Sequence, residues 1–248
     1  MKLLENLTYA NSDAAQVLDV YLPDIAVSAV FVYFHGGGLD HGDKSVASKM
    51  GEYLAERGVA VVSANYRMYP EHKYPDFLYD AATVVAWARE YMKKELACDN
   101  LYVGGSSAGG YISMMLCFDK RYLASVGIDN SAISGYFHDA GQPTAHFNVL
   151  KFAGIDPRRI IVDESAPLYH IGTDSEYPPM RFIVSDNDMK NRYEQTMLVL
   201  STMSHFGYQN YDHVVMNGKH CAYCRALDGE GVSVFGQMIE DFINSLKR

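Results

Sequence analysis

Positive charge, cysteine and long apolar runs are all in short supply in this 248-residue sequence. Its 21 Lys and Arg residues face 30 Asp and Glu residues, a net charge of −9, which argues against nucleic acid or an anionic membrane as a partner. No apolar run is long enough to span a membrane, and the first residues turn polar before a signal-peptide core could form, which predicts a cytoplasmic protein.

The four cysteines are too few for a disulfide scaffold and suit a reducing compartment. Cys221 and Cys224 form a Cys-x-x-Cys pair directly after His220. A structural zinc site usually needs two such pairs, and a thioredoxin-type pair lies at a helix start near the beginning of a βαβ unit. We therefore expect no metal and no organic cofactor, and interpret these cysteines as small, half-buried thiols.

What is present is a regular alternation of apolar runs with amphipathic segments. This pattern predicts an α/β fold with a mostly parallel sheet and helices on both faces. The predicted strands are residues 16–22, 27–34, 59–65, 101–104, 125–128, 180–184 and 212–216. The predicted helices are residues 45–57, 76–95, 108–118, 192–205 and 231–246. Because no repeat or linker interrupts the chain, residues 1–248 are expected to form a single domain.

A serine lies at the centre of a Gly-x-Ser-x-Gly pentad within residues 103–110. The pentad follows an apolar run and precedes a helix-like one, so the serine is expected on a sharp strand-to-helix turn with its hydroxyl exposed. Ser107 has glycine at both flanking positions, Gly105 and Gly109, whereas Ser106 has alanine at one of them. We therefore predict Ser107 as a nucleophile. A phosphate-binding Walker loop would need a Lys-Ser/Thr pair, which this stretch lacks.

A second motif, His-Gly-Gly-Gly at residues 35–38, follows the apolar run 29–33. Acyl transfer to a serine requires backbone N–H groups aimed at the oxyanion of the tetrahedral intermediate, and a glycine run lets the backbone come that close. A flexible loop is the plain alternative. Two such motifs in this order, each at a strand end, favour the catalytic interpretation.

These motifs, with Asn-Tyr-Arg-Met-Tyr-Pro-Glu-His at residues 65–72, resemble the hormone-sensitive-lipase-like carboxylesterases of the α/β-hydrolase superfamily. Residues 18–23 are similar to the first strands of bacterial feruloyl and carbohydrate esterases. The resemblance runs from about residue 17 to the last helix and is weak between residues 134 and 178. It implies an α/β-hydrolase fold and an oxyanion hole formed by the N–H groups of Gly37, Gly38 and Ala108.

A serine nucleophile also needs a histidine base and an acid that orients it. His220 follows the last predicted strand, as the chain order Ser, Asp, His requires. Asp186 and Asp188 both follow the preceding strand. Against the Gly-x-x-Asp turn of the resembled family, Ser185 takes the glycine place and Asp188 the acid place, so Asp188 is favoured. Asp186 stays open as the acid, and turn chemistry is the plain interpretation of either aspartate.

Residues 135–177 depart most from the resembled family and occupy the place where such hydrolases insert a lid. The aromatic residues of this segment form either an acyl or aryl pocket or the lid's own core. They are Tyr136, Phe137, Phe147, Phe152 and Tyr169. Only about fifteen residues precede the first predicted strand, too few for a long helical cap, so we expect an open site for small esters.

Together these features predict a serine carboxylesterase for short-chain, aryl or carbohydrate-linked esters, acting through an acyl-enzyme on a small-molecule ester. Assembly into a homo-oligomer stays open. The alternative is an arylformamidase, which comparison of N-formylkynurenine with p-nitrophenyl acetate as substrates would separate. A non-catalytic receptor on the same fold is a remote third hypothesis, because such receptors typically lose a triad member and this sequence offers all three.

Overall fold

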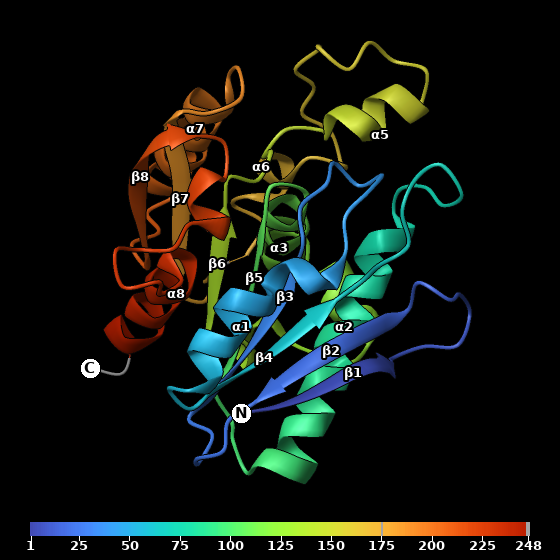
Figure 1. The fold of residues 1–248 in the computed structure, drawn as a ribbon. Coiled ribbons are helices and arrows are strands. Elements are labelled where there is room, and N and C mark those ends of the chain that lie inside the picture. Colours follow the sequence, from blue (N-terminus) through green and yellow to red (C-terminus); the bar gives the residue numbers. More distant parts are fainter. Residues whose placement is uncertain (175, 247–248) are drawn as a thin grey trace.

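The computed structural model describes residues 1–174 and 176–246, and its centre is an eight-stranded sheet (Figure 1). The strands are β1 (Lys2–Thr8), β2 (Val17–Leu22), β3 (Ala29–Phe34), β4 (Val59–Ala64), β5 (Leu101–Ser106), β6 (Gly135–Asp139), β7 (Met180–Asn187) and β8 (Tyr211–Lys219). Their order is β1-β2-β4-β3-β5-β6-β7-β8. β1 and β2 pair antiparallel, as do β2 and β4, and every other pairing is parallel, which confirms the predicted mostly parallel sheet.

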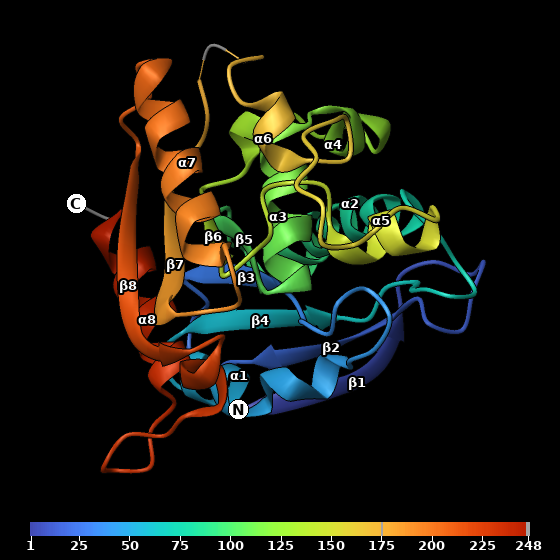
Figure 2. The same ribbon diagram turned by 90° about the horizontal axis from the view of Figure 1, so that it is seen from above.

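Helices cover both faces of the sheet, as predicted (Figure 2). On one face lie α1 (Ser48–Ala55) and α8 (Val234–Ser245), and on the other lie α2 (Asp76–Tyr91), α3 (Ala108–Phe118) and α7 (Arg192–His205). No helix of the described chain is both long and apolar enough to cross a membrane. The shorter helical segments are η1 (Lys44–Ala47), η2 (Met92–Leu96), α4 (Arg121–Ser125), η3 (Asn130–Ala132), α5 (Phe147–Phe152), α6 (Pro167–His170) and η4 (Ala222–Arg225).

The central strands are apolar along their whole length because both of their faces are covered. β3 reads Ala-Val-Phe-Val-Tyr-Phe and β4 reads Val-Ala-Val-Val-Ser-Ala, and all twelve residues are buried. Alternate residues of β3 point to opposite faces, so Val32 belongs to the core beneath α2 and α3 while Phe31 belongs to the core beneath α1 and α8. The sheet therefore separates two hydrophobic cores.

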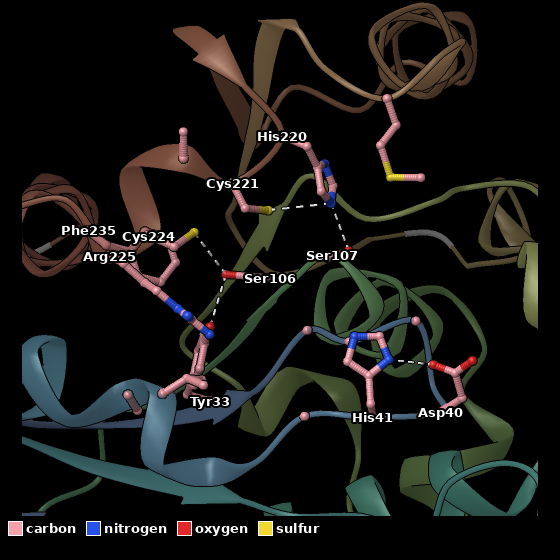
Figure 3. Close-up of a pocket in the computed structure, with 18 of the residues that line it drawn as sticks. Tyr33, Asp40, His41, Ser106, Ser107, His220, Cys221, Cys224, Arg225 and Phe235 are labelled. Carbon is pink, nitrogen blue, oxygen red and sulfur yellow. Dashed lines mark hydrogen bonds and ion pairs between the residues drawn. The ribbon is translucent and has the colours of Figure 1, made fainter.

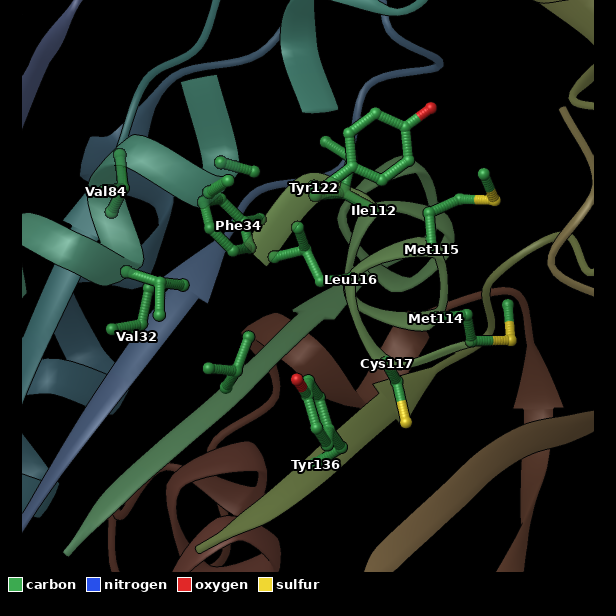
Figure 4. Packing of buried hydrophobic residues seen from close by; sticks show 14 of the residues in the cluster. Val32, Phe34, Val84, Ile112, Met114, Met115, Leu116, Cys117, Tyr122 and Tyr136 are labelled. Carbon is green, nitrogen blue, oxygen red and sulfur yellow. The ribbon is translucent and has the colours of Figure 1, made fainter. Parts of the chain in front are cut away.

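Helix α3 lies in the larger core and is buried on every side. All eleven of its residues are buried, as expected for a helix that is apolar all round. Figure 4 shows Ile112, Met115 and Leu116 of α3 in the cluster that contains Val32 and Phe34 of β3. This packing fixes the start of α3, directly after Ser107, relative to the end of β3.

Two sequence predictions are wrong in the middle of the chain. Residues 125–128 are not a strand, because the amides of Val126 and Ile128 donate to the carbonyl of Leu123 and close the end of α4. The sheet position is taken instead by β6, so residues 135–139 belong to the sheet and not to the predicted lid. β6 was hidden by His138 and Asp139, two buried polar residues whose partners come from distant parts of the chain.

Most other predicted elements are confirmed within a few residues, and the 192–205 helix has the predicted ends. β1 was not predicted, because it is an edge strand with several exposed side chains and pairs only with β2. The predicted helix 76–95 ends as an α-helix at Tyr91 and continues as the wider turn η2, after which Ala97 takes a left-handed conformation.

The first testable prediction concerns Gly109 in α3. A Cβ atom there would lie 1.8 Å from the carbonyl oxygen of Phe34, so an added methyl group must push helix and strand apart. We expect Gly109→Ala to lower the free energy of unfolding by about 3 kcal/mol or more, measured by urea denaturation. The control is Gly229→Ala, where a Cβ meets no atom within 4 Å and we expect almost no change. Equal stability of the two variants would contradict the close packing of α3.

Candidate active site

Ser107 lies at a sharp turn between β5 and α3. Its backbone has φ 56° and ψ −111°, a conformation that costs energy for a residue with a side chain. The Ser107 N–H donates to the carbonyl of Asp139 at 2.8 Å, which holds the turn in place. Of residues 101–110, only Ser107 is partly exposed to solvent. The neighbouring Ser106 is buried, with 4% of its surface exposed. The turn therefore presents the Ser107 hydroxyl and hides that of Ser106.

His220 lies between Ser107 and Asp188 and contacts both. The distance from His220 Nε2 to Ser107 Oγ is 2.8 Å, and the distance from His220 Nδ1 to Asp188 Oδ1 is 2.5 Å. Figure 3 shows the imidazole pointing at the Ser107 hydroxyl. The structure thus brings together the three residues that the sequence analysis selected as nucleophile, base and acid. In the chain, Asp188 lies 32 positions and Ser107 lies 113 positions from His220.

The acid and the base are held at the ends of neighbouring parallel strands. Asp188 directly follows β7 and His220 directly follows β8. The Ser185 hydroxyl donates to the carbonyl of Lys219 at 3.0 Å and so ties the two strand ends together. Asp188 also accepts from the backbone N–H groups of Met189 at 2.7 Å and Ser185 at 3.2 Å. These contacts leave one Asp188 oxygen aimed at the imidazole.

Asp186, the open alternative for the acid, does something different. Its carboxylate accepts from the Asn217 side chain at 3.0 Å and from the Gly218 N–H at 2.9 Å. The side chain is exposed and braces the end of β8. Asp186 therefore has a structural role between β7 and β8, and the geometry favours Asp188 as the partner of His220.

The carboxylate of Asp188 stabilises positive charge on the His220 imidazole. Burial lowers the pKa of His220, but the hydrogen bonds to Asp188 and Cys221 outweigh it and raise that pKa to about 9. Burial likewise raises the pKa of Asp188, while the hydrogen bond and charge of His220 hold it below its usual value. Asp188 thus stays an anion and stabilises the imidazolium that forms when His220 takes a proton.

The glycine loop that follows β3 lies against the serine turn. A Cβ on Gly36 would come within 3.2 Å of the Ser107 Cβ, and one on Gly37, where φ is +117°, would lie 1.9 Å from the carbonyl oxygen of His41. Only glycine fits at position 37, and a side chain at position 36 would press directly on the serine turn. Among the described residues, no recorded hydrogen bond uses the N–H groups of Gly37, Gly38 or Ala108. These three predicted oxyanion donors are therefore free to bind an anion.

The loop is held from two sides. The Asn148 side chain, from α5, donates to the carbonyl of Gly38 at 2.6 Å and to Asp40 at 3.0 Å. The segment 65–72 supports the other side, where the Tyr66 hydroxyl donates to the carbonyl of His35 at 2.8 Å. Sequence reasoning missed Asn148, because nothing local to an asparagine in a short helix points to a loop more than a hundred residues away.

An arginine and a carboxylate form a network behind segment 65–72. The sequence analysis did not single out the carboxylate, which is Asp80. Arg67 makes a two-pronged hydrogen bond with Asp80 of α2, whose carboxylate is 2% exposed. Glu71 is exposed. Planar pairing of this kind fixes orientation as well as adding energy, so Arg67 anchors the segment to α2.

A cavity of about 690 Å³ opens over Ser107. One part of its wall is apolar, with Val46, Met50 and Phe235, and another carries the polar or charged side chains of Asn148 and Lys151. Further lining residues include Tyr33, Gly37, Gly38, Phe147, Met189, His220, Cys221 and Cys224. The cavity has the size and the mixed lining of a site for a small molecule.

Of the five aromatic residues in the predicted lid, one lines this cavity. Phe147 of α5 does so, while Tyr136 and Phe137 are buried in β6. Phe152 stacks on Tyr69 at a ring distance of 4.2 Å, and Tyr169 is exposed. The aromatic residues therefore have separate roles and do not form one pocket.

A cluster of two thiols and a carboxylate lies beside the triad-like group. Asp139, at the end of β6, is fully buried and accepts hydrogen bonds from the Tyr223 hydroxyl and from Cys224 Sγ, the latter at 3.1 Å. Cys221 Sγ lies 3.8 Å from Asp139 Oδ2 and 3.7 Å from His220 Nε2. Burial raises the pKa of Asp139. Sequence analysis missed Asp139, because it lies in a strand that was not predicted.

Comparison with known proteins agrees with the fold and with the motifs. Residues 31–133 match the alpha/beta hydrolase fold family. Esterase LipI of Mycobacterium tuberculosis is 35% identical over 102 residues, which cover 40% of this chain and 32% of LipI. The probable carboxylic ester hydrolase LipM of the same organism is 26% identical over 207 residues, covering 74% of this chain and 47% of LipM. The matched part of the chain thus spans less than half of either relative.

Solved structures show the same fold over almost the whole chain. Esterase B from Lactobacillus Rhamnosis superposes with a TM-score of 0.78 at 18% identity, covering 99% of this chain and 86% of the other. A truncated carbohydrate esterase from gut microbiota gives the same TM-score and identity, with 100% and 97% coverage. The fold is that of the α/β hydrolases. The motifs and the family match over residues 31–133 agree with this fold.

The second prediction separates the two aspartates through hydrolysis of p-nitrophenyl acetate. Asp188→Asn keeps the shape of the side chain but removes the charge that faces His220, and we expect kcat to fall by roughly 10⁴-fold. Asp186→Asn removes only a brace at the end of β8 and should cost far less. Steady-state kinetics of both purified variants measure this. The opposite ranking would assign the acid to Asp186.

Proposed function

We propose that this protein is a serine esterase that hydrolyses small carboxylic esters, short-chain, aryl or carbohydrate-linked, through Ser107, His220 and Asp188. The observation that carries the proposal is the unbroken contact from Ser107 Oγ through His220 to Asp188, placed at the wall of a cavity. Esterase relatives in sequence and in fold support the same reaction class. No step of this mechanism needs a metal or a cofactor.

In the first half of the proposed reaction, Ser107 Oγ attacks the ester carbonyl while His220 Nε2 takes the serine proton. Asp188 stabilises the imidazolium, as its contact with Nδ1 allows. The N–H groups of Gly37, Gly38 and Ala108 bind the developing oxyanion, aided by the positive end of the α3 helix dipole. Collapse of the tetrahedral intermediate transfers a proton from His220 to the leaving alcohol and leaves an acyl group on Ser107.

The second half repeats these steps with water. His220 removes a proton from a water molecule, which attacks the acyl carbonyl, and the same backbone N–H groups stabilise the second oxyanion. The proton returns to Ser107 as the carboxylic acid departs. Every group used in the first half is used again, so the three side chains act as a unit.

The cavity supports small acyl groups as substrates. Its apolar part is bounded by Val46, Met50 and Phe235, and the last of these is 1% exposed and packed in the core of the α1 and α8 face. Among proteins of similar fold, structures of Thermogutta terrifontis esterase 2 are described with propionate and with butyrate bound. We infer that acyl groups of this size fit this chain.

The third prediction tests the nucleophile with a matched pair of serines. Ser107→Ala should abolish hydrolysis of p-nitrophenyl acetate and labelling by a fluorophosphonate probe, because both need the hydroxyl beside His220. Ser106→Ala should keep most of the activity, because the Ser106 hydroxyl is buried and bonded to Tyr33 at 3.1 Å. Mass spectrometry of the labelled peptide locates the adduct. Full activity in Ser107→Ala would overturn the proposed function.

The fourth prediction concerns acyl-chain length. Each added methylene contributes about 0.8 kcal/mol only where it can be buried against apolar surface. We expect kcat/KM for p-nitrophenyl esters to peak between acetate and butyrate and to fall steeply by octanoate. The same series assayed with Ser107→Ala corrects for background hydrolysis. A value that keeps rising to decanoate would show an apolar tunnel and point to a lipase.

A further inference from the structure

The mechanism above leaves one sequence motif unused, the Cys-x-x-Cys pair that follows His220. In the structure, Cys221, Cys224 and Asp139 offer two sulfur atoms and a carboxylate oxygen that all lie within 4.8 Å of one another. Around a tetrahedral zinc ion, neighbouring ligand atoms are roughly 3.5 Å apart, given Zn–S of about 2.3 Å and Zn–O of about 2.0 Å. The observed distances of 3.1 and 3.8 Å from Asp139 Oδ2 to the two sulfur atoms are close to that value.

We propose that Asp139, Cys221 and Cys224 form a binding site for a thiophilic divalent cation such as Zn²⁺, and that His220 completes it as a fourth ligand. Thiolates select soft or borderline cations, and the carboxylate and imidazole are common companions in zinc sites. A count of cysteine pairs along the chain leaves out Asp139, because β6 brings this side chain to the thiols only in the folded protein. His220 directly precedes the pair, and its Nε2 lies 3.7 Å from Cys221 Sγ.

The site is reachable from solvent. Both Cys221 and Cys224 line the cavity that contains Ser107, while Asp139 is buried behind them. Figure 3 shows the two sulfur atoms on the same side of the cavity, Cys221 facing His220 and Cys224 facing Ser106. A cation that enters the cavity therefore meets the two thiols first. It then reaches the Asp139 carboxylate behind them.

Binding requires no oxidant. Each thiol releases its proton to the buffer and forms a metal–sulfur bond through the thiolate, so two protons leave from the thiols, and a third leaves from His220 when its imidazole is charged. Asp139 gives up its hydrogen bond from Cys224 and accepts the metal, while its hydrogen bond from the Tyr223 hydroxyl holds the carboxylate in place. Two thiolates and one carboxylate together balance more than the charge of the ion, and the nearby imidazole is a neutral ligand.

Metal binding and esterase chemistry compete for one nitrogen. Cys221 Sγ lies 3.7 Å from His220 Nε2, the same atom that lies 2.8 Å from Ser107 Oγ. To bind the cation, the imidazole has to rotate toward the thiols, which moves Nε2 away from the serine. A nitrogen that binds a metal cannot take the serine proton, so a bound cation inhibits. This part of the inference rests on the proposed function, whereas cation binding itself does not.

The fifth prediction measures binding without reference to activity. Titration of the purified 248-residue protein with Co²⁺ should produce thiolate-to-cobalt charge-transfer absorption that saturates at one ion per chain. Cys224→Ser and Asp139→Asn should each weaken Co²⁺ binding by about 10-fold or more, because each removes one ligand. Cys98→Ser is the control, since Cys98 is buried in the core beneath α2 and should leave binding unchanged. Circular dichroism establishes that each variant is folded.

The same proteins then test the competition. ZnCl₂ should inhibit hydrolysis of p-nitrophenyl acetate, and EDTA should restore it. The zinc concentration that halves the rate, with each protein's zinc-free rate as its reference, should be about 10-fold higher or more in Cys224→Ser. Absence of the charge-transfer band, or a band that persists in both ligand variants, overturns the site. Saturating binding without inhibition overturns the role of His220. If no variant hydrolyses esters, the proposed function fails while the cobalt titration still decides the site.

Discussion

Three strand ends meet at a point where the chain has no room for side chains. A Cβ on Gly109 would collide with the carbonyl of Phe34 at the end of β3, and one on Gly110 would lie 2.3 Å from the carbonyl of Asp139 at the end of β6. Backbone packed this closely cannot shift without breaking contacts on both sides. Since β3 leads into the glycine loop, β5 leads into Ser107 and β6 ends at Asp139, this contact sets the distances among these three parts of the site.

The parts of the site that the sequence predicts are those whose signal is local. Ser107 lies in a pentad whose glycines have one physical use, a tight turn, and His220 follows the last strand candidate and precedes the final helix. Asp188 was harder to assign, because Asp186 stands two positions away and both aspartates suit a turn. Only the folded chain shows that Asp186 faces Asn217 and Gly218, on the outside, while Asp188 faces His220.

What the sequence did not predict depends on partners from distant segments. β6 contains His138 and Asp139, which look wrong for a buried strand until Ser113 of α3 and the thiol of Cys224 are placed beside them. The pattern of apolar residues therefore pointed to residues 125–128 instead, where α4 closes. Asn148 is a similar case, since its amide has meaning only once Gly38 lies next to it. Polar residues satisfied at long range leave no periodic signal.

The Asn148 contacts also bear on how such a site could be redesigned. The segment between β6 and β7 forms part of the cavity wall through Phe147 and Lys151, and the same short helix holds the carbonyl of Gly38 and the carboxylate of Asp40. Exchanging that segment to admit a different substrate therefore also removes a clamp from the glycine loop. A grafted segment has to bring its own amide donor to Gly38, or a gain in selectivity will be accompanied by a loss of rate.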